Sequence, residues 1–174
     1  MRGAVLFVVA AVVGFFAVRA VKPSAVQGIT DAATSAGGMI LEAIGMRGIR
    51  NNNPGNIRHS ATRWQGMATQ QTDSSFVQFT SAEYGIRALS KLIDTYANNY
   101  GLRTVRGIIG RYAPSAENNT GAYVASVSGA LGVGPDQVID VAAQKQQLIQ
   151  AIIKHENGIQ PYSLATISSG VAMA

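Results

Sequence analysis

Residues 148–158 have the sequence Leu-Ile-Gln-Ala-Ile-Ile-Lys-His-Glu-Asn-Gly, which predicts a helix that carries a carboxylic acid in its last turn. The apolar residues recur at a spacing that gives this helix one apolar face, and Gly158 supplies a stop signal. Glu156 then lies where exposed backbone carbonyls disfavour a second negative charge. A carboxyl group in that position tends to stay protonated, which suits a general acid. The alternative is an incidental glutamate at a solvated helix end.

The composition limits the classes of protein and partner. The chain has 174 residues, 47% of them hydrophobic, which is enough for one compact domain with an appendage. A net charge of +5 favours an anionic partner such as a cell-wall polymer, lipid headgroups or nucleic acid. The sequence has no basic run with interleaved aromatic residues, so it does not predict a nucleic-acid-binding surface. There is no cysteine, and His59 and His155 have no companions at metal-ligand spacing, so we expect no thiolate chemistry, no metal and no cofactor.

The N-terminal residues predict a membrane anchor. Residues 3–18 contain no charged or polar side chain, and Arg2, Arg19 and Lys22 flank them. As a helix these 16 residues would span about 24 Å, against roughly 30 Å for a hydrocarbon core, and the run can extend to residue 21. A cleaved secretory signal peptide is the alternative. We assign residues 1–22 to a transmembrane anchor that meets lipid through residues 3–21, and residues 23–46 to a linker with a spacer helix.

Residues 47–162 are expected to form an α+β domain that is mostly helical. Residues 51–56, Asn-Asn-Asn-Pro-Gly-Asn, predict a tight turn. Residues 64–67 and 75–79 predict the two strands of a β-hairpin around a polar segment. Capping residues and apolar periodicity predict helices over about 80–100, 104–113 and 119–131, and a last one that ends at Gly158. Residues 163–174 form a tail without an assigned structure.

Nine acidic residues allow the candidate acids to be compared. Glu83 completes a predicted capping box at Thr80. Six others precede the domain, lie off an apolar stripe, or take turn and cap positions: Asp31, Glu42, Asp73, Asp94, Asp136 and Asp140. Glu117 lies in a loop between two predicted helices, where it either points into a cleft or caps the next helix. Glu156 and Glu117 are therefore the candidate catalytic residues.

Two segments resemble lysozyme-like lytic transglycosylases. Residues 148–158 are similar to the helix of that family that ends in a catalytic Glu followed by Ser-Gly. Residues 76–85, Phe-Val-Gln-Phe-Thr-Ser-Ala-Glu-Tyr-Gly, resemble the family's Gly-Leu-Met-Gln segment, a hairpin strand with an active-site glutamine. The two segments occur here in the opposite order. The resemblance therefore implies a lysozyme-like domain that is circularly permuted, which adjacent chain ends permit.

A second resemblance rests on several separated motifs. They are Arg47-Gly-Ile-Arg-Asn-Asn-Asn-Pro-Gly-Asn-Ile-Arg58, Trp64-Gln-Gly66, Tyr84-Gly-Ile-Arg-Ala88, Tyr112-Ala-Pro114, Glu117-Asn-Asn-Thr120 and His155-Glu-Asn-Gly158. Together they are similar to the phage and prophage proteins described as structural protein P5-like. Those proteins resemble virion-associated enzymes that open peptidoglycan during host entry or lysis, so the resemblance implies peptidoglycan and other virion proteins as partners.

The resemblance to transglycosylases implies a role for each site residue. Glu156 would protonate the glycosidic oxygen between N-acetylmuramic acid and N-acetylglucosamine, and then assist the sugar's own 6-hydroxyl to form a 1,6-anhydro product. Four side chains would hydrogen-bond the sugar: Gln78, Asn53, Asn56 and Asn118. Three aromatic rings could stack on it: Tyr112, Tyr123 and Trp64. Core packing is the alternative for each ring, and satisfaction of their own turn is the alternative for the asparagines.

Other functions remain open at this point. Water could replace the sugar hydroxyl, which would make the protein a hydrolase. Cleavage of the peptide cross-links would need a metal or nucleophile that the sequence does not display. An inactive structural virion protein is a further alternative. With the predicted anchor, the expected location is the virion membrane or the host inner membrane.

Overall fold

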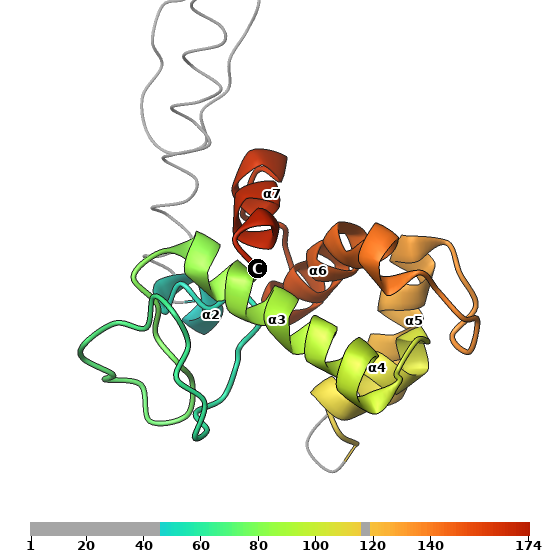
Figure 1. Cartoon of the computed structure of the whole chain (residues 1–174), viewed down its shortest axis with the longest axis horizontal. Helices are drawn as coiled ribbons and strands as arrows, with labels where there is room; N and C mark the ends of the chain where they lie inside the picture. The colour runs from blue at the N-terminus through green and yellow to red at the C-terminus, as the bar shows by residue number, and fades with distance from the viewer. Residues whose placement is uncertain (1–45, 116–118) are drawn as a thin grey trace, which may run out of the picture. The chain divides into compact units, whose positions relative to one another are not determined.

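The computed structural model describes residues 46–115 and 119–174, which form helices joined by turns and loops (Figure 1). The helices are α2 (Arg47–Arg50), α3 (Ala82–Tyr100), α4 (Val105–Tyr112), α5 (Thr120–Leu131), α6 (Val141–Asn157) and α7 (Leu164–Ala172). The long loop between α2 and α3 lies at the N-terminal end of α3, whereas α4 lies beside its C-terminal end (Figure 1).

Helix α6 lies at the centre of the core, because it packs against α2, α3, α5 and α7. Its apolar face consists of residues that are 0% exposed: Leu148, Ile149, Ile152 and Ile153. Gly158 ends the helix in the left-handed conformation with φ 71°. Glu156 therefore lies in the last turn of the helix, as the sequence predicts.

The other predicted helices are present, with one difference at a terminus. Helix α3 buries an apolar stripe of Ile86, Leu89 and Ile93 and is followed by Gly101 with φ 65°. Its N-cap is Ser81, and no side-chain hydrogen bond caps it, so the expected capping box at Thr80 is not formed. The side chains of Thr104 and Asn119 cap α4 and α5.

The C-terminal residues, to which the sequence assigned no structure, form helix α7 and pack against α3. Ser163 caps α7 by accepting a hydrogen bond from the backbone N–H of Thr166 at 3.1 Å. Ile167 is fully buried in the common core. The two helices approach closely at Gly170, where an added Cβ would lie 2.6 Å from Cβ of Ile86. The segment is therefore part of the folded domain.

The expected β-hairpin is wrong, and with it the α+β class, because the described residues contain isolated bridges and no strand. Residues 76–80 bond to three different segments instead of to one partner. The backbone N–H of Val77 donates to Ile57 at 2.9 Å, that of Phe79 donates to Asn51 at 2.9 Å, and that of Thr80 donates to Gly66 at 2.9 Å. A ladder needs consecutive pairs with the same neighbour, so the alternation of buried Val77 and Phe79 occurs without a hairpin.

The expectation of an N-terminal transmembrane helix concerns residues 1–22, which lie outside the described residues, as does the spacer up to residue 45. No helix within residues 46–115 or 119–174 has both the length and the apolar character required to cross a bilayer. The described fold is thus a helical domain with one long irregular loop.

Candidate functional site

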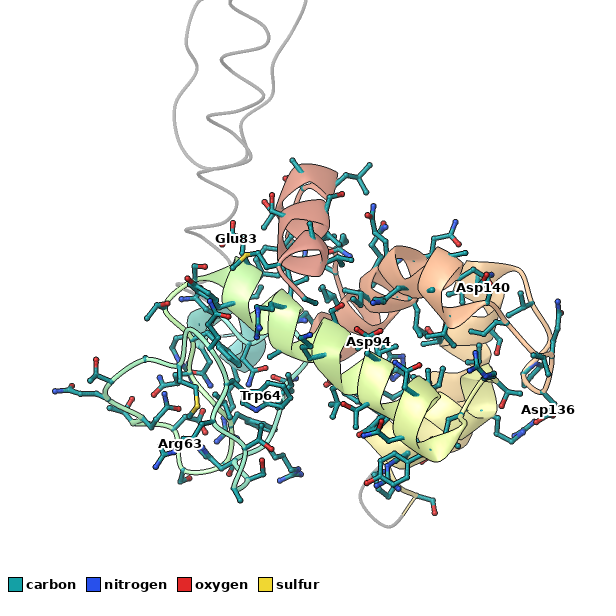
Figure 2. All side chains as sticks on the ribbon, viewed as in Figure 1. Arg63, Trp64, Glu83, Asp94, Asp136 and Asp140 are labelled. Atoms are coloured by element: carbon teal, nitrogen blue, oxygen red, sulfur yellow. The ribbon has the colours of Figure 1, made fainter. Side chains whose placement is uncertain are left out.

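A cleft with a volume of about 520 Å³ lies between the long loop and the helices. Residues 55–60, Thr62, Trp64 and Phe76 of the loop line it, together with Leu92, Thr95 and Tyr96 of α3, Tyr112 and Ala113 at the end of α4, and Glu156 of α6. Figure 2 shows Trp64 on the side of the loop toward α3, with Arg63 farther from that helix. The volume falls within the range of about 300–1,000 Å³ that is usual for sites of small ligands.

Glu156 is half-buried in the wall of this cleft. The amide Nδ2 of Asn56 donates a hydrogen bond to its Oε2 at 2.9 Å, and the hydroxyl of Tyr123 donates to its Oε1 at 2.8 Å. A carboxylate offers about four lone-pair sites. Each oxygen therefore keeps a site for a proton or a ligand while the two donors fix the plane of the carboxyl group.

Tyr123 reaches Glu156 from α5 and is held by rings on two sides. It is 3% exposed. Its ring stacks on that of His155 with centroids 3.7 Å apart and meets the ring of Tyr112 edge-on at 6.4 Å. Burial raises the pKa of the Tyr123 hydroxyl, and the nearby Tyr112 and Glu156 raise it further. The hydroxyl therefore stays protonated at neutral pH and acts as a donor to Glu156.

Tyr112 is anchored by the loop. Its hydroxyl donates to the backbone carbonyl of Gly55, and burial, followed by the charge of Glu156, raises its pKa well above the usual value. An added Cβ on Gly55 would lie 2.7 Å from that hydroxyl. A side chain at Gly55 would therefore displace the ring, which explains the glycine in the turn.

The asparagine-rich turn is fastened to the end of α6. Asn157, which follows Glu156, donates from Nδ2 to the carbonyl of Pro54 at 2.9 Å. Asn56 adopts the left-handed conformation with φ 50°, which asparagine tolerates better than most residues. Its Nδ2 reaches Glu156, while its Oδ1 is buried without a hydrogen-bond partner among the described residues. The turn thus places one amide directly against the candidate acid.

The predicted site residues fall into four groups in the structure. Asn56, Tyr112, Trp64 and Glu156 line the cleft. Tyr123 contacts Glu156 from behind the cleft wall, and its nearly complete burial leaves no open ring face for a sugar. Glu117 and Asn118 lie outside the described residues.

Gln78 and Asn53 are bound within the loop. Asn53 is 0% exposed, and its amide bonds both to the backbone of Ile57 and to the carbonyl of Val77. Gln78 donates to Asn51 at 3.2 Å and accepts from the backbone N–H of Thr72 at 2.5 Å. The hydrogen bonds of these two side chains stabilise the loop, a role that a β-ladder would have in a hairpin.

Four of the other described carboxylates form ion pairs or cap a helix. Asp73 pairs with Arg47, Asp94 with Lys145, and Asp136 with Arg106. Asp140 caps α6, as its position in the sequence suggests. Of the acids that the structure describes, Glu156 alone lines the cleft.

Sequence reasoning missed the part of the cleft formed by Leu92, Thr95 and Tyr96 on α3 and by Arg58 and His59 after the turn. Tyr96 belongs to the apolar stripe of α3, so the sequence pattern predicts that it is buried in the core and does not indicate that it also lines the cleft. Arg58 and His59 directly follow the asparagine-rich turn, and that proximity was the one available signal. Within the described residues no cluster of three metal-ligating side chains occurs.

Comparison with known proteins identifies a relative. No protein-family model matches the chain. The chain is similar to "Protein P5" of Pseudoalteromonas phage PM2, with 37% identity over 127 residues that cover 71% of this chain and 79% of the relative.

Proposed function

Since the chain belongs to the family of Protein P5 of Pseudoalteromonas phage PM2, we propose that it is a virion-associated phage protein that cleaves peptidoglycan glycan strands as a lytic transglycosylase. The observation that carries this proposal is the position of Glu156. It is the one described acid in the wall of the cleft, and two side chains from distant parts of the chain orient it.

The proposed reaction needs one acid and no water. Glu156 donates its proton to the glycosidic oxygen between N-acetylmuramic acid and N-acetylglucosamine, and the bond from that oxygen to the anomeric carbon breaks. The resulting carboxylate accepts the proton of the 6-hydroxyl on the same muramic residue, and that oxygen bonds to the anomeric carbon. A 1,6-anhydro end forms, and Glu156 is protonated again. Ordinary glycosidases need a second carboxylate at a defined separation, which this chemistry does not.

Asn56 and Tyr123 support both steps because each remains a hydrogen-bond donor. They stabilise the carboxylate after it has lost its proton, and they hold its plane while the proton moves. Asn56 and the rings of Tyr112 and Trp64 line the cleft and would contact the sugar. Gln78, Asn53 and Tyr123 instead support the site, because their polar atoms bond to the protein.

The test is digestion of purified peptidoglycan by the full chain and by Glu156→Gln. The amide has the shape of the acid but cannot donate a proton from an acidic group, so we expect clearing to fall by at least about 100-fold, the lower range for one general acid. Glu83→Gln is the matched control, since it makes the same change in the first turn of α3, away from the cleft lining. Mass spectrometry of the products distinguishes the possible reactions by the mass of the new sugar ends.

Each outcome selects one function. Products with 1,6-anhydro ends support the transglycosylase, and products heavier by one water identify a hydrolase. Free amines without new sugar ends identify a peptide cleaver. No clearing by the unaltered protein means a structural virion protein, and clearing by Glu156→Gln at the level of Glu83→Gln would show that another group is the acid.

A further inference from the structure

An exposed tyrosine and an arginine meet at the end of α3, outside the lining of the cleft. Tyr100 is the last residue of α3 and is 53% exposed. The guanidinium carbon of Arg111, on α4, lies 3.5 Å from the centroid of the Tyr100 ring and 5.4 Å from that of Tyr96. The ring of Tyr96 meets that of Tyr100 edge-on at 6.4 Å. One face of Tyr100 is therefore covered by a cation, while half of the residue remains open to solvent.

The stacking leaves the hydrogen-bonding capacity of Arg111 in place. A guanidinium stacks through its flat face, whereas its five N–H donors point outward in the plane. No hydrogen bond or ion pair joins Arg111 to any of the side chains in residues 46–115 and 119–174. Arginine held on an aromatic ring is pre-organised to bind a carboxylate through two parallel hydrogen bonds.

This pair continues the wall of the cleft. Leu92 and Tyr96 line the cleft, and Tyr100 follows at the same spacing of four residues, which keeps all three on one face of α3. On α4, Arg111 directly precedes Tyr112 and Ala113, both of which line the cleft. The end of α3 lies beside α4 in Figure 1. A chain that leaves the cleft along α3 would therefore meet Tyr100 and Arg111 next.

We propose that Tyr100 and Arg111 form a distal subsite for a sugar that carries a carboxylate. The open face of Tyr100 packs against the pyranose ring, and Arg111 binds the carboxylate. In peptidoglycan that carboxylate belongs to the stem peptide or, on a muramic acid whose stem peptide has been removed, to the lactyl group. The inference rests on the proposed action on peptidoglycan, and it adds that the protein holds the strand at a second point by its charge.

The simpler alternative is that Arg111 only shields an aromatic ring. Shielding makes no distinction between neutral and anionic glycans. A carboxylate subsite would bind peptidoglycan more tightly than chitin, because chitin has the same kind of pyranose ring without the carboxylate. Comparison of the two polymers therefore separates the alternatives.

The experiment is co-sedimentation of the full chain with insoluble polymer, in the Glu156→Gln background so that no strand is cut. The polymers are intact peptidoglycan sacculi, sacculi stripped of stem peptides, and chitin. Arg111→Gln removes the cation, and Arg106→Gln is its control, because it makes the same charge change on the same helix, where the native arginine pairs with Asp136. Tyr100→Ala removes the ring, and Tyr100→Phe keeps it.

We expect Arg111→Gln to weaken binding to sacculi about ten-fold, the effect of losing one charge-assisted contact, and to reduce the loss of binding as salt rises. Binding to chitin should stay unchanged. Tyr100→Ala should weaken binding to all three polymers, and Tyr100→Phe should not. Loss on intact sacculi alone assigns the carboxylates of the stem peptide, loss on stripped sacculi alone assigns the lactyl carboxylate that stripping exposes, and loss on both shows that the subsite accepts either carboxylate.

The subsite is overturned if Arg111→Gln binds sacculi like Arg106→Gln, or if it loses chitin and sacculi equally. This outcome does not depend on catalysis. Binding that requires Arg111, by a protein that clears no peptidoglycan, would leave the subsite in place and reject the transglycosylase.

Discussion

Glu156 owes its position to two side chains that are far from it in the sequence. Asn56 approaches from the loop, 100 residues away, and Tyr123 from α5, 33 residues away. Asn53 belongs to the same turn as Asn56 but has a different role, because its side chain is fully buried and bonds only to backbone groups. At the residue scale, hydrogen-bond partners decide which polar groups are available to a substrate.

The hydroxyl of Tyr123 gives a residue-scale prediction. Tyr123→Phe removes the donor to Glu156 but keeps the ring between His155 and Tyr112. Because a lost hydrogen bond to a charged group is worth roughly 1.5–3 kcal/mol, we expect clearing of peptidoglycan to fall about 10- to 100-fold. The free energy of unfolding should fall by no more than about 1.5 kcal/mol, the usual contribution of one hydrogen bond to stability. Initial rates and unfolding curves check this, and a variant as active as the unaltered protein would show that the contact does not serve catalysis.

At the scale of elements, α7 packs tightly against α3. Gly170 lies where an added Cβ would meet Ile86 at 2.6 Å and the carbonyl of Glu83 at 2.8 Å. Backbone and a β-branched side chain cannot move aside without shifting the helices. The close fit explains why a segment of small, weakly apolar residues folds as a helix: it gains its stability from burial of Ile167 and from contact with α3.

Two glycine-to-alanine variants test this contact. Gly170→Ala should destabilise the protein by about 1–3 kcal/mol, the usual result of overpacking. Gly129→Ala in α5 makes the same change where an added Cβ would meet nothing within 4 Å, so it should stabilise by up to about 1 kcal/mol through helix propensity. Denaturant unfolding measures both. Equal effects of the two substitutions would refute the close packing of α7 on α3.

At the scale of the whole described domain, an ion pair fastens the long loop to α2. Asp73 accepts hydrogen bonds from Arg47 at 2.5 and 2.6 Å, from Asn51 at 2.8 Å, and from the backbone of Ser75 and Phe76 at 3.0 Å. Its side chain is 6% exposed. The bond from Arg47, more than the backbone and Asn51 donors, lowers the pKa of Asp73 well below its usual value. The hydrogen bonds to Asp73 therefore stabilise the loop that forms one wall of the cleft.

The lowered pKa predicts how stability depends on pH. A carboxyl group whose folded pKa is depressed contributes stability above its unfolded pKa of about 3.9, and this contribution is lost as the pH falls below that value. The unaltered protein should therefore exceed Asp73→Asn in stability at pH 7, and the difference should shrink between about pH 5 and pH 2.

Asp136→Asn is the control for this prediction. Asp136 also pairs with an arginine, but its side chain is 71% exposed, and exposed ion pairs contribute little. Its difference from the unaltered protein should be small at every pH. Unfolding by denaturant at a series of pH values makes the comparison, and a difference for Asp73→Asn that stays constant down to pH 2 would contradict the role of the ion pair.

The helices and the candidate acid could be predicted from the sequence because their causes are local. Apolar spacing along α3 and α6, side-chain caps at Thr104 and Asn119, and the left-handed glycine at Gly158 act within a few residues. The same local logic placed Glu156 in the last turn of its helix.

Only the tertiary structure decided the path of residues 51–81, the fold of residues 163–174 and the environment of Glu156. The alternation around Val77 predicted a strand, but it cannot specify a partner, and here Asp73 and Gln78 satisfy backbone groups that a hairpin would have paired. Hydrogen bonds across 33 and 100 residues leave no periodic trace in the chain, so the contacts of Glu156 with Tyr123 and Asn56 could come only from packing.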